Sequence, residues 1–467
     1  MGKPQNQQPK LFYHGFSLEN RLPKEHALRK ISRLVNFAFI RSQVKHLYGI
    51  NGNTSIDPAV ILKLMFLMFY ENIKSERVLM EQLPLRLDWL WFCGYSFDDQ
   101  TPDHSVISKA RRRWGQEVFS DFFANILQQC IDAGLVDGKT IHIDSSMIDG
   151  NVSKDTLKPQ LRMLGQKLYQ DIESQDNNDK PLQQRVSQTD PDARIGKKYD
   201  KSTLGYKDHR VVDDKFGIVT ATVTTPANVH DGKLLAEAIQ THQSNTDTKV
   251  DTVVADKAYG NIENYKHLKD NGIKPCIPHQ THRKKENAAF EKDAFKYDPQ
   301  RDCCICPAQQ LLHRYDHDKP YQGNKYRYRA KRKICEQCRY FTQCVSSKNF
   351  GRQIDRNLDI EYTNWADGCL GNGTRRRLMA RRRIKAEGSF ADAANNHGFK
   401  RARWRGIVKM RIQNLMIAAI QNLRKLIRYL HKNTTATAAT AIKTSLFEPF
   451  AMAISTICVL CEKHIIL

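Results

Sequence analysis

The chain has 467 residues, of which 40% are hydrophobic and 27% are charged, a composition typical of a folded protein with two or more domains. Lysine and arginine number 74 against 50 acidic residues, which leaves a formal net charge of +24 and a pI near 9.5. Such an excess favours a polyanionic partner, either nucleic acid or an acidic membrane surface, and the composition excludes a disordered tail.

The sequence gives little support for a membrane-associated protein. The longest apolar run, from Ala451 to Leu460, is shorter than the roughly 20 residues that a spanning helix needs. The first residues, "MGKPQNQQPKLFYHGF", lack the apolar core of a signal peptide. We therefore expect a cytoplasmic protein with no membrane partner, in which disulfides are unlikely and the 12 cysteines need another explanation.

Residues 1–137 are predicted to form a helical N-terminal domain. The stretch "IDPAVILKLMFLMFYENI" has a long apolar face, and two further helices are expected on either side of Trp114. Lys109, Arg111 and Arg112 cluster at the end of "HSVISKARRRW", so this segment is a candidate recognition helix for DNA. The alternative is that these cations only complement the helix dipole.

From residue 138 to 278 the pattern changes to strands. The segments "TIHIDSSMID", "LGYKDHRVVDD" and "GIVTATVTTPAN" predict three strands, followed by a helix that Asp231 can cap, the strand "TVVA", a second helix and a last short strand. The polar stretch from Leu157 to Thr203 interrupts this order and predicts a loop or insertion. The strand "TVVA" runs directly into Asp256, a carboxylate that is costly to desolvate unless a positive group meets it.

Residues 279–355 form a cysteine-rich insertion. The pairs Cys303-x2-Cys306 and Cys335-x2-Cys338 have the spacing of zinc knuckles, so a structural Zn²⁺ is predicted here. Alternative ligands are Cys304 and Cys344. The competing interpretation is a set of reduced cysteines in an insertion that has lost its metal.

Residues 356–431 are predicted to form basic helices that complete the core, and residues 432–467 form a tail of unknown role. The stretch "RRRLMARRRIKAEGSF" begins a helical region that continues past a break at His397-Gly398. In this stretch, most of the charged residues around Glu387 are cations. One interpretation pairs Glu387 with Arg383, one helical turn earlier. The other groups Glu387 with Asp144 and Asp256.

The second interpretation predicts a metal site. Asp144 lies in the first predicted strand and Asp256 ends the fourth, so the two aspartates meet if these strands are neighbours. The later helix can bring Glu387 across them. Three carboxylates supply the hard oxygen ligands that suit Mg²⁺ or Mn²⁺.

Five motifs in this order resemble bacterial insertion-sequence transposases of the DDE type. They are "IHIDSSMIDGN", "LGYKDH", "GIVTATVTTPANVHD", "VVADKAYGN" and "RRRIKAEGSF…HGFKRARWRGIVKMRIQNLMIAAIQNL", and the similarity runs from about Ile56 to Leu426. The resemblance implies an α/β fold with an RNase H-like, mixed-sheet catalytic core and Asp144, Asp256 and Glu387 as the metal-binding triad. It also implies double-stranded DNA partners, both terminal inverted repeats and target, bound by a homodimer in the bacterial cytoplasm at the nucleoid.

Basic residues near the predicted site and in the N-terminal helix are candidate DNA contacts. They are Arg383, Lys385, Lys400, Arg401, Arg403, Arg405, Lys109, Arg111 and Arg112. The chain departs from the pattern of related transposases, Y-x2-R-x3-E-x6-K, because Ala380 and Ala394 stand at the Tyr and Lys positions. Lys385, Lys400 and Arg401 are expected to compensate in part.

The function that follows is DNA transposition. Two ions about 4 Å apart can activate an attacking water or 3′-hydroxyl and stabilise the leaving oxygen, so one site can cut element ends and join them to target DNA. Two alternatives stay open: an RNase H-like nuclease without joining activity, and a non-catalytic, zinc-containing DNA-binding protein derived from a transposase.

Overall fold

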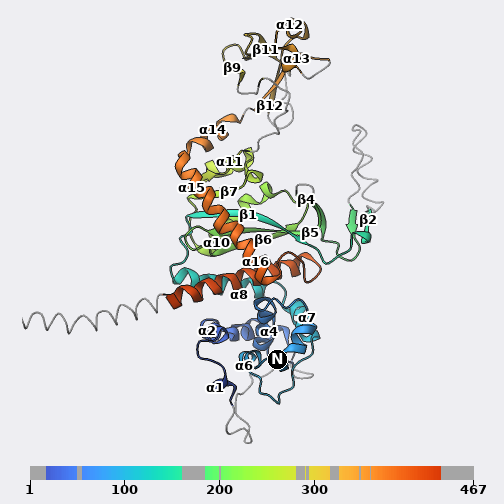
Figure 1. The fold of residues 1–467 in the computed structure, drawn as a ribbon, viewed down its shortest axis with the longest axis vertical. Helices are drawn as coiled ribbons and strands as arrows, with labels where there is room; N and C mark the ends of the chain where they lie inside the picture. Colours follow the sequence, from blue (N-terminus) through green and yellow to red (C-terminus); the bar gives the residue numbers. More distant parts are fainter. Residues whose placement is uncertain are drawn as a thin grey trace, which may run out of the picture. The chain divides into compact units, whose positions relative to one another are not determined.

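The computed structural model describes residues 17–49, 55–159, 185–198, 201–279, 290, 294–315, 325–345, 349–357 and 359–432 (Figure 1). The chain divides into two compact units. The first joins residues 1–250 to residues 380–467, and the second comprises residues 251–379. Each unit is described by itself below.

The first unit begins with short helices packed around one apolar helix, α4. They are α1 (Leu18–Arg21), α2 (Ala27–Leu34), α3 (Ile40–Val44), α4 (Pro58–Tyr70), α5 (Glu76–Gln82), α6 (Leu87–Cys93), α7 (Ser105–Trp114) and α8 (Glu117–Asp132). Asp57 caps α4 by accepting a hydrogen bond from the Ala59 amide at 3.1 Å, and Pro58 at the first turn needs no partner. Because α4 is buried on nearly every side, it anchors the helices that surround it.

The sheet of the first unit is built on two long antiparallel strands, β1 (Thr140–Asp149) and β5 (Lys201–Asp213). Along its other edge, β5 pairs first with β4 (Arg194–Lys198) and, further along the strand, with β6 (Val219–Pro226). The short strands β2 (Leu157–Pro159) and β3 (Arg185–Ser187) pair with each other. The 3₁₀ turn η5 (Asp231–Leu234) and helix α10 (Leu235–Thr246) follow β6, and α10 packs on β5 and β6.

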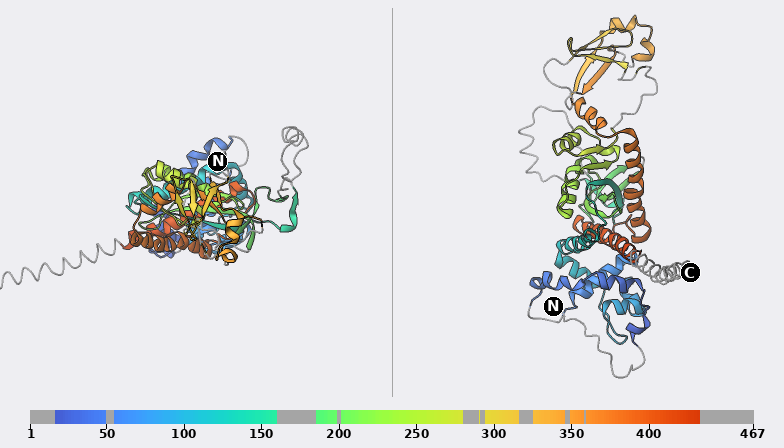
Figure 2. Two further views of the ribbon diagram at one scale, coloured as in Figure 1. Left: turned by 90° about the horizontal axis from the view of Figure 1, so that it is seen from above. Right: turned by 90° about the vertical axis from the view of Figure 1, so that its left-hand side faces the viewer.

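The last elements of the chain return to this unit. The π-turn η8 (Arg383–Glu387) contacts β1 and β5 and continues into α16 (Gly388–His397), which ends at Gly398 in the left-handed conformation. A long helix, residues 407–432, lies beside α8 between the sheet and the N-terminal helices (Figures 1 and 2). Its apolar face shares one core with α4 and α8, so the first and last parts of the chain fold together.

The second unit contains a parallel pair of strands and a separate antiparallel sheet. Strands β7 (Thr252–Ala255) and β8 (Lys274–Cys276) pair in parallel, and the turn η6 (Lys257–Tyr259) and helix α11 (Ile262–Asp270) connect them. Helices α14 (Ile360–Gly368) and α15 (Asn372–Arg382) end this unit. The five-stranded sheet has the order β13-β12-β11-β10-β9. Its elements are β9 (Lys296–Asp298), β10 (Cys303–Ile305), β11 (Leu311–Arg314), β12 (Lys325–Arg329) and β13 (Gln353–Asn357), with α12 (Arg332–Glu336) and α13 (Phe341–Cys344) between the last two.

The structure confirms the predicted order of strands and helices between residues 140 and 276. Parallel and antiparallel pairs both occur, so the architecture is mixed α/β as expected. The polar stretch after β1 is only partly a loop, because β2, β3, β4 and the start of β5 lie in it. Residues 160–184 and 199–200 of this stretch fall outside the described residues. Within the described part of the chain, no helix combines the length and apolar character that crossing a membrane requires.

Candidate active site

Asp144 lies in the middle of β1, opposite Arg210 of β5. Its side chain is 12% exposed. One carboxylate oxygen accepts a hydrogen bond from the Ser145 amide at 2.9 Å, and the other lies 3.1 Å from Nη1 of Arg382. A carboxylate in the centre of a sheet is thus met by a positive group from an element far away in the sequence, which offsets the cost of its burial.

Glu387 ends the π-turn that follows α15, and its side chain is 50% exposed. Nη2 of Arg382 donates to its carboxylate at 2.9 Å. The predicted ion pair with Arg383 is wrong, since Arg383 is exposed and the partner of Glu387 is Arg382. The reason is the backbone, because a π-turn brings residues five apart together where an α-helix brings residues four apart.

Arg382 therefore contacts both predicted site carboxylates of the first unit at once. Its side chain is 11% exposed. Within the described residues, Nε and Nη1 of Arg382 have no hydrogen-bond partner, so the contact with Asp144 is an ion pair without a well-aligned hydrogen bond. Three charged groups thus lie close together here, and some of the hydrogen-bond donors of the guanidinium are unused.

Two neighbouring basic residues fix the π-turn against the sheet. Arg381 forms an ion pair with Asp214 at 2.7 Å, and Nζ of Lys385 donates to the Lys215 carbonyl at 3.2 Å. Asp214 also contacts Nε2 of the fully buried His142 at 2.7 Å, and burial lowers the pKa of His142. Burial and the nearby Arg381 lower the pKa of Lys385. Lys385, a predicted DNA contact, thus packs against the protein.

A second polar network lies on the opposite face of β1 from Asp144. Ser145 Oγ and Lys207 Nζ donate to the two carboxylate oxygens of Asp231 at 2.7 and 2.8 Å. Burial alone would raise the pKa of Asp231, but these hydrogen bonds outweigh it and lower the pKa. The prediction that Asp231 caps the following helix is wrong, because His230 caps that turn by accepting from the Gly232 amide.

On the same face of the sheet as Asp144, the neighbouring strand β5 holds a fully buried ion pair that the sequence did not predict. Arg210 Nε donates to Asp208 at 2.7 Å, and Arg210 Nη1 donates to Gln421 at 2.8 Å. The guanidinium also lies 4.8 Å from the ring centroids of Phe390 and Phe399. The motif "YKDHRVVD" thus ties α16 and the C-terminal helix to β5. Alternation along the strand, which puts Asp208 and Arg210 on one face, was the available signal.

Asp256, the third predicted carboxylate, belongs to the second unit. It directly follows β7 and caps the turn η6, where its carboxylate accepts a hydrogen bond from the Ala258 amide at 2.9 Å. Its side chain is half-buried, whereas Tyr259 in the same turn is fully buried. The strand-end position predicted from "TVVAD" is confirmed.

The remaining predicted DNA contacts divide into exposed and structural residues. Lys400 Nζ donates to Ser146 Oγ at 2.6 Å, two residues along β1 from Asp144, and Arg401 and Arg405 are exposed. Arg403 instead donates to the carbonyls of α4 and the residues after it, and burial lowers its pKa to about 10. Geometry favours a structural role for Arg403.

The basic residues at the end of α7 also fall into exposed and structural ones. Lys109 and Arg112 are exposed. Arg111 is buried, forms an ion pair with Glu76 and lies 3.8 Å from the ring centroid of Trp404. Arg111 therefore holds α7 to the other helices.

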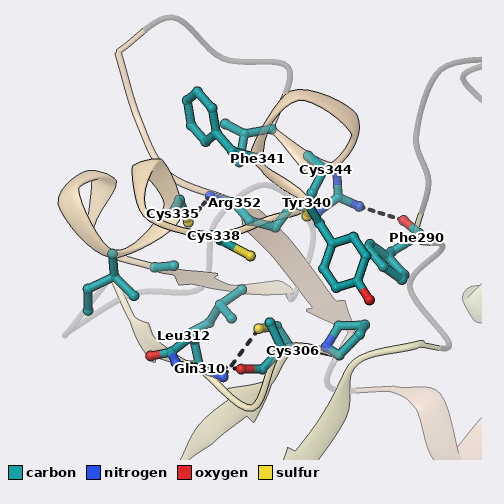
Figure 3. A pocket seen from close by; sticks show the side chains of 15 residues that line it. Phe290, Cys306, Gln310, Leu312, Cys335, Cys338, Tyr340, Phe341, Cys344 and Arg352 are labelled. Carbon is teal, nitrogen blue, oxygen red and sulfur yellow. Dashed lines mark hydrogen bonds between the residues drawn. The ribbon is translucent and has the colours of Figure 1, made fainter.

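The predicted zinc ligands do not all lie together. Cys306, Cys335, Cys338 and Cys344 line one small cavity, whereas Cys303 and Cys304 lie within strand β10 and do not line it (Figure 3). Among the described residues, no three or more His, Cys, Asp or Glu side chains are already arranged to hold a metal ion, and this applies to the carboxylates and to the cysteines.

Comparison with known proteins identifies two transposase regions. Residues 16–113 match the model of the transposase domain DUF772, and residues 305–427 match that of the transposase DDE domain. The transposase of insertion sequence element IS1106 from Neisseria meningitidis serogroup B is 29% identical over 168 residues, which are 36% of this chain and 52% of that protein. The chain thus spans about half the length of this curated relative.

Two solved structures are similar at a low level. The piggyBac transposase synaptic complex with hairpin DNA has 11% identity and a TM-score of 0.23, over 87% of this chain and 82% of that chain. The Mos1 transposase paired-end complex has 10% identity and a TM-score of 0.15, over 51% and 64%. At these TM-scores the alignments support no structural argument. The family models and the curated relative are the comparisons that bear on the family, and both support an insertion-sequence transposase of the DDE type.

Proposed function

We propose that the chain is a DNA transposase that cuts at insertion-sequence ends and joins the 3′-hydroxyl ends to target DNA. The observation that carries the proposal is the pairing of Asp144 and Glu387 with one guanidinium, that of Arg382. These two carboxylates come from a central strand and from a helix near the end of the chain. Packing a helix on a sheet does not require a buried carboxylate in the strand, and burying one is costly. Its presence therefore favours a functional role.

We further propose that Asp144, Asp256 and Glu387 hold Mg²⁺ or Mn²⁺. The donor set fits these ions, because all three residues offer carboxylate oxygens and both aspartates are partly shielded from solvent. When bound, a pair of such ions supplies activation of the attacking hydroxyl and stabilisation of the leaving oxygen. The inclusion of Asp256 rests on the family resemblance, which implies an RNase H-like core, and on its place directly after β7.

Residues of the chain itself would then bind and orient the DNA. Lys400 contacts Ser146 of β1, two residues from Asp144, and Arg383 is exposed on the same π-turn as Glu387, so we propose that both contact phosphates near the site. Arg401 and Arg405 extend this exposed basic set, and Lys109 and Arg112 present a second one on α7. We propose that a homodimer presents these surfaces to terminal repeats and target DNA in the bacterial cytoplasm, at the nucleoid.

The test uses fluorescent duplexes that cover the two DNA flanks of the gene, with a supercoiled plasmid as target. Wild-type protein with Mg²⁺ or Mn²⁺ should cut the flanks and join them to the plasmid. Asp144→Asn and Glu387→Gln should abolish both steps, while Glu237→Gln, at an exposed position of α10, should leave them intact. Cutting without joining would instead indicate a nuclease, and salt-sensitive binding without cutting would indicate a non-catalytic DNA-binding protein.

A further inference from the structure

The cavity in the cysteine-rich part of the chain has a volume of about 30 Å³ and lies under the turn that connects β10 to β11. Its wall combines four cysteines with apolar and aromatic side chains, and Figure 3 shows the labelled cysteines on its sides. They come from two separate segments. Cys306 follows β10, whereas Cys335, Cys338 and Cys344 lie on and between α12 and α13.

The backbone around Cys306 forms a turn that presents its sulfur to the cavity. The Gln310 amide donates to Cys306 Sγ at 3.3 Å, and the Cys306 amide donates to the Gln310 carbonyl at 2.9 Å. On the other side, the Arg352 amide donates to Cys335 Sγ at 3.5 Å. Amide donors directed at sulfur stabilise the thiolate form, which is the form that binds metal.

Close packing restricts what can stand beside Cys335. A side chain added at Gly351 would place its Cβ 2.4 Å from the Ala330 carbonyl oxygen and 3.1 Å from Cys335 Sγ. The backbone therefore approaches this sulfur as closely as a glycine allows.

The strand cysteines are in a different environment. Cys303 pairs across the ladder with His313, and Cys304 pairs with Leu312. Cys304 packs in the apolar cluster of this sheet with Leu312 and Tyr328. Neither side chain lines the cavity, and the β10–β11 ladder fixes the backbone at both positions.

We propose that Cys306, Cys335, Cys338 and Cys344 bind one structural Zn²⁺ as four thiolates. This set differs from that predicted from knuckle spacing, since Cys344 replaces Cys303. The thiols must move inward on binding, because the described side chains are not yet arranged to hold an ion and tetrahedral Zn–S bonds are about 2.3 Å long. The ion would join the β10–β11 turn to α12 and α13, two helices with no buried residues of their own.

The chemistry favours zinc over a hard cation, because four soft thiolates in a closed site select it. It also explains how a sheet with a very small apolar core is kept ordered, since metal binding adds directly to the folding free energy. This site is independent of the carboxylates proposed for catalysis, and it is closed and structural.

The experiment measures metal content of the full chain purified under reducing conditions, followed by replacement with Co²⁺. The wild type should contain one zinc per chain, and the Co²⁺ form should show the intense sulfur-to-cobalt charge-transfer band and the visible bands of a tetrahedral tetrathiolate site. Cys338→Ser and Cys344→Ser should lose the zinc. Cys303→Ala should retain it.

Two results would overturn the proposal. One is retention of zinc by Cys344→Ser together with its loss from Cys303→Ala. The other is a wild-type chain that takes up neither Zn²⁺ nor Co²⁺ while its four cavity thiols react freely with a thiol reagent or form disulfides. A Cys303→Ala chain that still gives the tetrathiolate cobalt spectrum excludes Cys303 as a ligand, so the choice between the two cysteine sets does not depend on whether a serine variant folds.

Discussion

Replacing Arg382 with glutamine tests whether its guanidinium occupies the place of a divalent cation. The substitution removes the positive charge that lies 3.1 Å from Asp144 and 2.9 Å from Glu387 and keeps a shorter, polar side chain. The same change at the exposed Arg383 is the matched control, because it removes an identical charge one residue away.

The two carboxylates contribute unequally to the expected loss of stability. Glu387 is 50% exposed, so its pair with Arg382 is screened by solvent and should contribute at most about 1 kcal/mol. Asp144 is only 12% exposed. Removing one partner of a buried ion pair typically costs about 3 to 5 kcal/mol, and less where the pair is partly exposed. Arg382→Gln should therefore destabilise the protein in EDTA by about 2 to 4 kcal/mol.

Metal binding should change in the opposite direction. Arg382 and a cation compete for Asp144 and Glu387, so removing the competitor should strengthen Mg²⁺ binding by the free energy that the ion pairs contribute. At about 2 kcal/mol this is roughly a 30-fold lower dissociation constant.

Thermal unfolding in EDTA and across a Mg²⁺ titration, with calorimetric binding of Mg²⁺ as the second measurement, gives both quantities. Arg383→Gln should match wild type in each. The reasoning fails if Arg382→Gln is as stable as wild type in EDTA, or if its Mg²⁺ affinity stays within twofold of wild type.

Four further predictions concern Asp256, Arg403, His209 and the binding of duplex DNA. Asp256→Asn should abolish end joining and Mg²⁺ binding without unfolding the protein; a variant that still joins DNA would remove Asp256 from the proposed site. Arg403→Ala should destabilise the protein by about 3 kcal/mol in chemical denaturation, because it removes the hydrogen bonds of the guanidinium to the Met68 and Ile73 carbonyls and its packing over Phe69. Arg405→Ala, at an exposed position, should cost less than about 1 kcal/mol and mainly weaken DNA binding. Burial lowers the pKa of His209 from 6.5 to about 4, so the unfolded chain binds this proton more readily and stability should fall by about 3 kcal/mol as pH drops from about 6.5 to 4. A stability profile for His209→Gln that matches wild type over this window would exclude His209 as a source. Finally, duplex DNA binding should weaken by orders of magnitude between about 50 and 200 mM salt, measured by fluorescence anisotropy.

Periodicity predicted the elements around the site because it reports local backbone preference. The strand predicted from "TIHIDSSMID" and the strand-end position of Asp256 are both found in the structure. Periodicity failed for Glu387, since an interval of 3.6 residues selects Arg383, whereas the π-turn selects Arg382. A single added residue in a helical turn leaves no clear mark on composition, so the correct partner could not be read from the sequence.

The zinc prediction shows a second limit of sequence patterns. Knuckle spacing identifies a region that can bind metal, and the structure still places four cysteines of that region around one cavity. Spacing cannot tell which of two neighbouring sulfurs faces the cavity. Cys303 and Cys306 are three residues apart, and only the end of strand β10 between them separates a sulfur fixed in the ladder from one presented by a turn.

Arginines also differ in whether the fold buries them or leaves them exposed, and this difference refines the prediction for the salt dependence of DNA binding. A net charge of +24 does not mean that all its cations are available to phosphates, because Arg111, Arg210 and Arg403 are committed to carboxylates, rings and carbonyls inside the fold. The slope of log affinity against log salt counts only the cations that displace counterions from DNA. Arg112→Ala should therefore reduce that slope by about 1. Arg111→Ala, one residue away, should lower stability and leave the slope unchanged in protein that remains folded. Equal slopes for the two variants would mean that exposure does not decide which arginines meet the DNA.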